Sequence, residues 1–154
     1  MLLKSLNHDL RIIAVALVSL SALFITAAQA DIYISGEQRP NTPSDQAKNN
    51  FKCGDRIYGV VVGNWPNKSK HVLEAYWVDP QGKQREHSRY RFTAGQGKTR
   101  TWVWLQLHAG EADIVDRLLM QENESTRQFN GKWKVTFYID GKKKKEVSFN
   151  VSCE

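Results

Sequence analysis

Two runs of alternating apolar and polar residues near the end of the chain constrain its fold most strongly. Residues 133–139 place apolar side chains at every second position, and residues 147–153 do the same. Asp140 and Gly141, between the runs, tolerate the positive φ angles of a tight turn. The pattern therefore predicts a β-hairpin. Because an isolated hairpin is only marginally stable in water, its apolar face requires a second layer of structure.

The chain before this hairpin contains further runs typical of short strands, separated by turn residues. Glu37–Asn50 is polar and aperiodic, which predicts a surface loop or a loosely attached arm. Glu111–Gln121 changes to the spacing of a short amphipathic helix. Together these segments predict a mainly β fold, an antiparallel β-sandwich of about seven strands with one short helix. The strands expected before the hairpin cover residues 31–36, 51–62, 71–79, 84–92 and 99–108.

Several of these features occur together in a known architecture. Cys53 lies on the second expected strand, Trp77 on the third and Cys153 on the last, and the chain closes with Gly-x-Trp-x-Val-x-Phe, Asp-Gly and Phe-x-Val. This arrangement resembles the immunoglobulin-like β-sandwich of small secreted bacterial domains. True immunoglobulin domains carry the second cysteine on the penultimate strand. The resemblance therefore implies the architecture alone and transfers no functional residue.

The first 30 residues have the pattern of a secretory signal peptide. Lys4 and Arg11 precede an apolar run over residues 12–28, and Ala28-Gln29-Ala30 supplies small residues at the positions that a signal peptidase contacts. We expect cleavage between Ala30 and Asp31. A retained membrane anchor is the alternative, and the small-x-small site followed by polar sequence argues against it. Residues 31–154 are then expected to form one periplasmic or secreted domain without a transmembrane segment.

Both cysteines of the chain, Cys53 and Cys153, lie in this expected mature part. An even number of cysteines in an oxidising compartment favours a disulfide. No Cys-x-x-Cys motif indicates a redox-active pair. We therefore predict a Cys53–Cys153 bond that ties an early strand to the last one.

The expected strand over residues 99–108 has two unlike faces. Val103 and Leu105 point to one side, whereas Trp102 and Trp104 point to the other. If the aliphatic side is the core, the two tryptophans form an exposed aromatic shelf that can bind sugar rings or a protein partner. The alternative is that the helix Glu111–Gln121 or a neighbouring loop covers them, and the usual burial of aromatic rings favours this alternative.

Four consecutive lysines, Lys142, Lys143, Lys144 and Lys145, follow the turn of the closing hairpin. They concentrate positive charge in a chain whose formal net charge is +6, which favours an anionic envelope polymer or a lipid headgroup as a partner. Their alternative role is to keep the hairpin soluble and to discourage edge-to-edge aggregation. Nucleic acid is not an expected partner of an exported domain.

Motifs for catalysis or for metal binding are weak in this chain. His71, His87 and His108 lie on separate expected strands, and zinc accepts three imidazole ligands. No His-x-His, His-Glu-x-x-His or Gly-x-Ser-x-Gly motif supports a metal centre or a nucleophile. We therefore predict no catalytic residue, no metal site and no cofactor, and expect the histidines at the surface or at strand edges.

The sequence thus favours a non-catalytic periplasmic or secreted binding or accessory domain that works through a sheet face or through the basic hairpin. Its expected partner is an envelope protein or an anionic or glycan polymer. One alternative is a small envelope hydrolase or metal-dependent enzyme. Another is an adhesin or pilus-like structural subunit, although such a subunit is expected to lack its own last strand, which residues 147–153 supply here.

Overall fold

The computed structural model describes residues 30–107 and 128–153, which form β-strands and contain no helix. The expected signal peptide, the expected helix Glu111–Gln121 and His108 lie outside these described residues, apart from Ala30. The fold is mainly β, as the sequence predicted. The strands in chain order are β1 (Asp31–Ser35), β2 (Glu37–Arg39), β3 (Thr42–Pro43), β4 (Asn50–Lys52), β5 (Arg56–Asn64), β6 (Lys70–Val78), β7 (Gln84–Thr93), β8 (Lys98–Gln106), β9 (Gly131–Ile139) and β10 (Lys142–Ser152).

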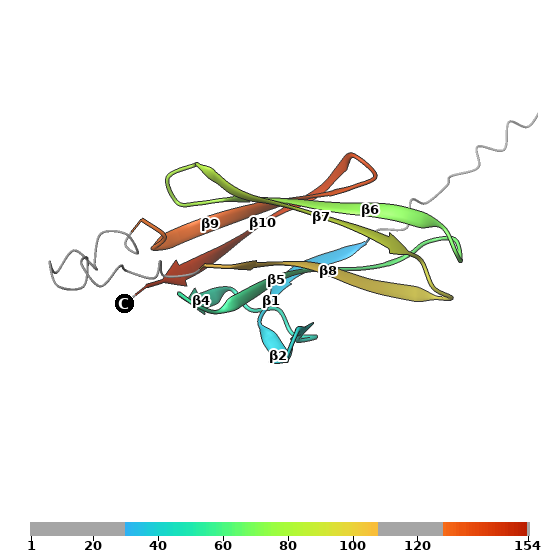
Figure 1. The fold of residues 1–154 in the computed structure, drawn as a ribbon, viewed down its shortest axis with the longest axis horizontal. Coiled ribbons are helices and arrows are strands. Elements are labelled where there is room, and N and C mark those ends of the chain that lie inside the picture. The colour runs from blue at the N-terminus through green and yellow to red at the C-terminus, as the bar shows by residue number, and fades with distance from the viewer. Residues whose placement is uncertain (1–29, 108–127, 154) are drawn as a thin grey trace, which may run out of the picture.

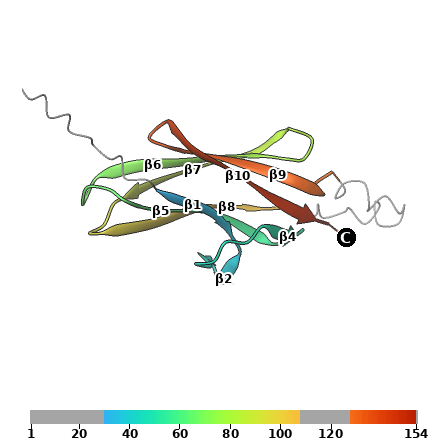
Figure 2. The ribbon, with the colours of Figure 1, turned by 180° about the vertical axis from the view of Figure 1, so that it is seen from behind.

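The strands form a five-stranded, a three-stranded and a small two-stranded sheet. The five-stranded sheet has the order β4-β10-β9-β6-β7, the three-stranded sheet has the order β1-β5-β8, and β2 pairs with β3. All pairs are antiparallel except β4 with β10. The five-stranded sheet lies over the three-stranded one, and β2 lies on the far side of the smaller sheet (Figure 1). The same layers are visible from behind (Figure 2).

The closing hairpin is the predicted one. Its turn residues Asp140 and Gly141 have φ angles of 52° and 74°, and Phe149 pairs with Trp133 across the two strands. The four lysines belong to the first part of β10 rather than to a loop, and the strand register shifts between Lys143 and Lys145.

The core lies between the two larger sheets. Gly59 of β5 lies close against the larger sheet, because a Cβ atom there would lie 2.5 Å from the ring of Phe137. The aliphatic face of the strand over residues 99–108 is the core face, since Val103 and Leu105 are buried, and on β6 Leu73, Ala75 and Trp77 are fully buried. The largest fully buried side chains of this core are Trp77, Trp133, Phe137, Phe149, Ile32, Ile34, Ile57, Leu73, Val61 and Val135.

The polar segment over residues 36–49, which we call the arm, is attached more firmly than the sequence predicted. The Ser35 hydroxyl donates to Ser44 O at 2.8 Å, and Lys48 N donates to Ile34 O at 2.9 Å. The arm covers the outer face of the three-stranded sheet, where Tyr58 and Val60 are fully buried outside the main core. This cover explains the apolar run Val60-Val61-Val62, since β5 is buried on both faces.

Two expectations about the strands need correction. The described residues contain ten strands rather than about seven, because the arm adds β2 and β3 and one expected strand is divided in two. The expected strand Phe51–Val62 is two strands, interrupted at Gly54, whose φ is 92°. As a result, β4 joins the larger sheet and β5 the smaller one.

The predicted disulfide is confirmed: Cys53 follows β4, and its bond to Cys153 ties that strand to the end of β10. Within the described ranges, no helix is long and apolar enough to cross a membrane.

Candidate binding groove

The edge strand β7 of the five-stranded sheet lies beside β8, the edge strand of the three-stranded sheet. Tyr90 lies on the same face of β7 as Phe92, which is 8% exposed, yet Tyr90 itself is 51% exposed. Trp104, on the outer face of β8, is 49% exposed. Among the described residues, these are the two large hydrophobic side chains left exposed. Such rings at a surface commonly mark a binding site.

Tyr90 and Trp104 line the same depression between β7 and β8. One hollow of ≈ 580 Å³ is lined by residues 90–93 of β7 with 99–102 and 104 of β8. A second, of ≈ 550 Å³, is lined by residues 86–90 and 102–106. Both include Tyr90, Trp102 and Trp104, so they form one elongated feature, which we call the β7–β8 groove.

Arginine side chains fix the two tryptophans that the sequence singled out. The guanidinium of Arg56 lies 4.9 Å from the ring centroid of Trp104, and that of Arg100 lies 5.7 Å from Trp102. Such cation–π contacts contribute about 0.5–1 kcal/mol each at exposed sites. Trp102 is partly buried, so Trp104 is the more accessible of the two rings.

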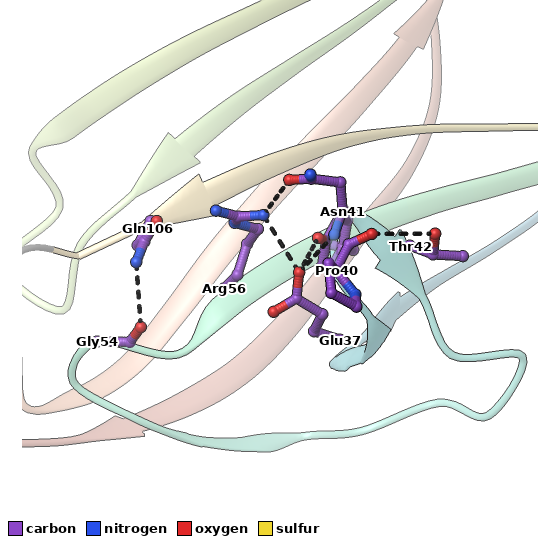
Figure 3. Close-up of polar contacts among 8 residues, drawn as sticks. Glu37, Pro40, Asn41, Thr42, Gly54, Arg56 and Gln106 are labelled. Carbon is purple, nitrogen blue, oxygen red and sulfur yellow. Dashed lines mark hydrogen bonds and ion pairs between the residues drawn. The ribbon is translucent and has the colours of Figure 1, made fainter.

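The arm holds Arg56 in position behind Trp104. Arg56 Nη1 donates to Glu37 Oε1 at 3.2 Å and to Asn41 Oδ1 at 2.5 Å (Figure 3). Two hydrogen bonds lower the pKa of Glu37 below its ordinary value. The larger effect comes from Asn41 N and the smaller one from the Tyr58 hydroxyl. Glu37 is therefore ionised at neutral pH, and the aromatic ring is positioned before any ligand arrives.

The first hollow of the groove carries positive charge, whereas the second also contains the exposed carboxylate of Glu86. Arg89 lies 3.7 Å from Glu74, and Arg100 lies 3.2 Å from Asp45 and donates to Ser44 O at 2.9 Å. Arg91 forms no ion pair within residues 30–107 and 128–153, and it lines the first hollow beside Tyr90. An unneutralised arginine beside exposed rings favours an anionic ligand.

The first hollow also contains an unsatisfied polar atom. Thr101 is 4% exposed and lines this hollow, but its Oγ1 has no hydrogen-bond partner in the described structure. Buried hydroxyl groups normally have one. Because this Oγ1 atom is itself buried, it is not accessible to a ligand unless neighbouring side chains move.

The lysines of β10 do not contribute to this groove. Lys145 Nζ donates to Ile32 O at 2.7 Å, and Lys143 lies 3.6 Å from Glu146. Neither hollow of the groove is lined by any of the four lysines. The two sets of predicted binding residues therefore differ: the tryptophans line the groove, and the lysines do not.

The two described histidines occupy different surroundings. His87 stacks on Tyr76 with ring centroids 4.2 Å apart and lies 3.3 Å from Glu74. His71 packs against Trp65 and Phe92. In the described part of the chain, no three histidine, cysteine or acidic residues are grouped as metal ligands would be.

His71 does, however, belong to a polar chain that the sequence did not indicate. Ser69 Oγ lies 2.7 Å from His71 Nε2, and His71 Nδ1 lies 2.7 Å from Asp140 Oδ2. These are the contacts of a nucleophile, a base and an orienting carboxylate. Ser69 Oγ also lies 2.5 Å from Pro66 O, which can only accept, so the carbonyl competes with His71 for the hydroxyl proton.

Asp140 is held in this chain by two donors. Burial acts to raise the pKa of Asp140, but the hydrogen bonds from His71 and from Val72 N outweigh it, and the pKa lies below its ordinary value. The sequence marked Asp140 only as a turn residue and His71 only as a candidate ligand. Their meeting across 69 positions of the chain had no local signal.

Tyr90 was also missed as a binding residue. It alternates with Phe92, and that pattern indicates an inward-facing, buried side chain. A signal was nevertheless present, because β7 is rich in charged residues, as edge strands often are. An aromatic residue that faces inward on an edge strand remains exposed where a groove separates that strand from the other sheet.

Comparison with known proteins gives no family. No protein-family model matches the chain, and no curated protein matches it. Solved structures with a similar arrangement include a β-glucosidase from Listeria innocua in complex with glucose, with a TM-score of 0.43 and 10% identity over 82% of this chain and 16% of that one. The CARDB domain of a Pyrococcus furiosus protein, in complex with di-metal ions, has a TM-score of 0.39 and 8% identity over 82% of this chain and 93% of that one. Likenesses this weak support no conclusion about ligand or activity.

Proposed function

We propose that this protein is a non-catalytic binding or accessory domain that takes its ligand in the β7–β8 groove. The observation that carries the proposal is the position of Tyr90 and Trp104, the two large exposed rings of the described residues, on one concave surface. The positive charge of Arg91 beside them favours an anionic ligand, such as an envelope protein or an acidic polymer.

An exported location is part of the proposal. The signal-peptide pattern of residues 1–30 predicts secretion, and a disulfide is typical of the periplasm or the exterior. If cleavage occurs after Ala30, the intact mass of the exported protein should equal that of a chain that starts at Asp31. An uncut form in the membrane fraction would contradict this expectation.

We also propose that the architecture is an immunoglobulin-like sandwich. Two facing sheets with one shared core support this assignment. The disulfide, between the segment after β4 and the end of the last strand, differs from the pattern of antibody domains. The sandwich places the groove at one open side, where β7 and β8 are the terminal strands of their sheets.

The direct experiment is ligand capture by the exported protein. Immobilised protein is incubated with separated protein and polysaccharide fractions of the envelope, and retained material is quantified. Trp104→Ala and Tyr90→Ala should each lower retention by about tenfold or more, because exposed aromatic residues dominate interface energy. Tyr138→Ala, on β9 and away from the groove, is the matched control.

Equal retention by Trp104→Ala, Tyr90→Ala and Tyr138→Ala would contradict a ligand site in the groove. Loss of retention with Lys142→Ala and Lys143→Ala instead would move the site to the basic part of β10. Circular dichroism and thermal unfolding of each variant separate loss of binding from loss of folding.

A small hydrolase is the second candidate, and the contacts among Ser69, His71 and Asp140 favour it. In that case Ser69 is the nucleophile, His71 the base and Asp140 the orienting group. Labelling by a fluorophosphonate probe tests this role. Labelling that is lost in Ser69→Ala and in His71→Ala would favour the hydrolase. Absence of labelling in the unsubstituted protein would indicate that these three residues only link β6 to the hairpin turn.

A further inference from the structure

The groove is built from strand edges rather than from a sheet face. In the described structure, β7 pairs only with β6, and β8 pairs only with β5. Each therefore carries a row of backbone N–H and C=O groups on its other side without a strand partner. These two free edges bound the groove.

The lining residues support this geometry. A sheet face exposes every second residue of a strand, because successive side chains alternate between faces. The groove instead is lined by the consecutive residues 86–93 of β7 and, across the two hollows, 99–106 of β8. A run of consecutive residues lines a surface when the backbone edge itself is exposed there.

The two edges differ in how well they are protected against pairing. β7 carries charged residues at Arg85, Glu86, Arg89 and Arg91, and charges discourage addition of another strand. Between Thr99 and Gln106, β8 carries only one charged residue, Arg100, whose guanidinium is turned to Ser44 and Asp45 of the arm. The edge of β8 is therefore the receptive one.

The groove also limits the length and composition of its occupant. Eight residues at about 3.3 Å each give a length of about 25 Å, which fits an extended segment of about eight residues. Val103 and Leu105 form part of the floor, while Arg89 and Arg91 belong to the β7 side. A segment that alternates apolar and acidic residues satisfies both the floor and the charge.

We infer that the β8 edge binds an extended acidic polypeptide segment by strand addition, with alternate apolar side chains toward the groove floor and its negative charge attracted by the nearby Arg91. The inference rests on the proposed function and names its partner class. Backbone hydrogen bonds supply much of the affinity in this mode of recognition, and alternate side chains supply specificity. Tyr90 and Trp104 flank the bound segment.

The probe is a capped peptide of about eight residues with alternating valine and glutamate, and the comparison peptide has lysine in place of glutamate. We expect the acidic peptide to bind the exported protein and the lysine peptide to bind at least about tenfold more weakly. Arg91→Glu should lower the affinity for the acidic peptide by about tenfold. Lys132→Glu, the same charge change on an exposed residue of β9, should leave this affinity unchanged.

Backbone participation is tested by two further peptides, methylated on the amide nitrogens of all valines or of all glutamates. Successive amides of a strand point to opposite edges, so one of the two methylated peptides lacks the N–H donors that face β8. We expect that peptide to lose binding. Amide hydrogen exchange of the protein should show new protection at alternate residues of β8 when the unmodified peptide is bound.

Three results would overturn strand addition. They are equal binding of all methylated peptides, absence of alternating protection along β8, and protection of every β8 amide already in the free protein. If Trp104→Ala still abolishes capture of an envelope ligand, the proposed function stands without this mode. Binding of polygalacturonate but not of the acidic peptide would assign the groove to an acidic glycan.

Discussion

Trp104 and Leu105 are adjacent on β8, but their side chains lie on opposite faces and have different roles. Leu105 is 7% exposed and packs in the core, whereas Trp104 is half exposed above Arg56. This difference between neighbours follows from the two-residue period of a strand. At the scale of single residues, it separates the groups that stabilise the fold from those that can bind a ligand.

Leu105→Ala should lower the free energy of unfolding by about 2–5 kcal/mol, because burial is lost and a cavity remains. Trp104→Ala should lower it by about 1 kcal/mol or less, since the ring is half exposed and contributes chiefly its contact with Arg56. Urea unfolding of both variants measures the difference. A loss at Trp104 as large as that at Leu105 would contradict the assignment of this ring to a binding surface.

Asp79 gives the fold a defined dependence on pH. Its side chain is buried, and it accepts hydrogen bonds from Gln81 N, Lys83 N and Arg85 Nε. Burial acts to raise the pKa of Asp79, but the bonds from Lys83 N and then from Arg85 outweigh it, so the pKa is lowered. The stabilisation is therefore complete above the unfolded-state pKa of about 3.9 and is lost as the pH falls through the folded-state pKa.

Asp79→Asn should lower the free energy of unfolding by about 1.5–3 kcal/mol at pH 7, because charge-assisted hydrogen bonds are lost. The difference from the unsubstituted protein should shrink in unfolding experiments below pH 4, where the aspartate is protonated in the unfolded state. Glu86→Gln, which changes an exposed carboxylate, is the control and should have little effect. A penalty at Asp79 that does not change with pH would indicate that shape rather than charge matters.

At the scale of elements, β5 is packed closely on both of its faces. It is buried on one side by the main core and on the other by the arm, so its residues 57–61 are all buried. Gly59 lies directly against the ring of Phe137 on β9. No larger side chain fits there unless the sheets move apart.

Gly59→Ala should therefore lower the free energy of unfolding by about 1–3 kcal/mol through overpacking. Gly95→Ala is a matched control, because the nearest atom to a Cβ there is Thr99 Oγ1 at 3.9 Å. Thermal unfolding of both variants measures the difference. Equal melting temperatures would show that the Phe137 ring can move aside at little cost.

At the scale of the whole molecule, the Cys53–Cys153 bond closes a loop with a sequence separation of 100 residues. On the chain-entropy account, a loop of this length stabilises the folded state by about 4–5 kcal/mol, because it restricts the unfolded chain. The bond adds a covalent tie to the short parallel pair of β4 and β10, which spans only three residues.

Reduction should lower the melting temperature by about 12–25 °C. The double variant Cys53→Ser and Cys153→Ser should melt near the temperature of the reduced protein, and reducing agent should not change it further. Differential scanning calorimetry with and without reductant makes the comparison. An unchanged melting temperature on reduction would show that the packed sheets alone maintain the fold.

The sequence by itself determined the features that depend on neighbours along the chain. Alternation set the buried faces of β6, β8, β9 and β10, and Asp140-Gly141 set the closing turn, because period-two patterns and positive φ angles are local properties. The pairing of Cys53 with Cys153 was predictable for a different reason, since two cysteines allow one intramolecular bond.

Only the tertiary structure decided which side chains of an expected face remain exposed. Tyr90 has the pattern of a core residue, and it is exposed because it lies on the edge strand β7, where the groove separates β7 from β8. Tyr58 is buried because the arm folds back over β5, and Asp140 reaches His71 because the hairpin turn lies beside β6. Each outcome depends on how many strands each sheet contains and on which segments meet across it, and those are long-range contacts that no local pattern encodes.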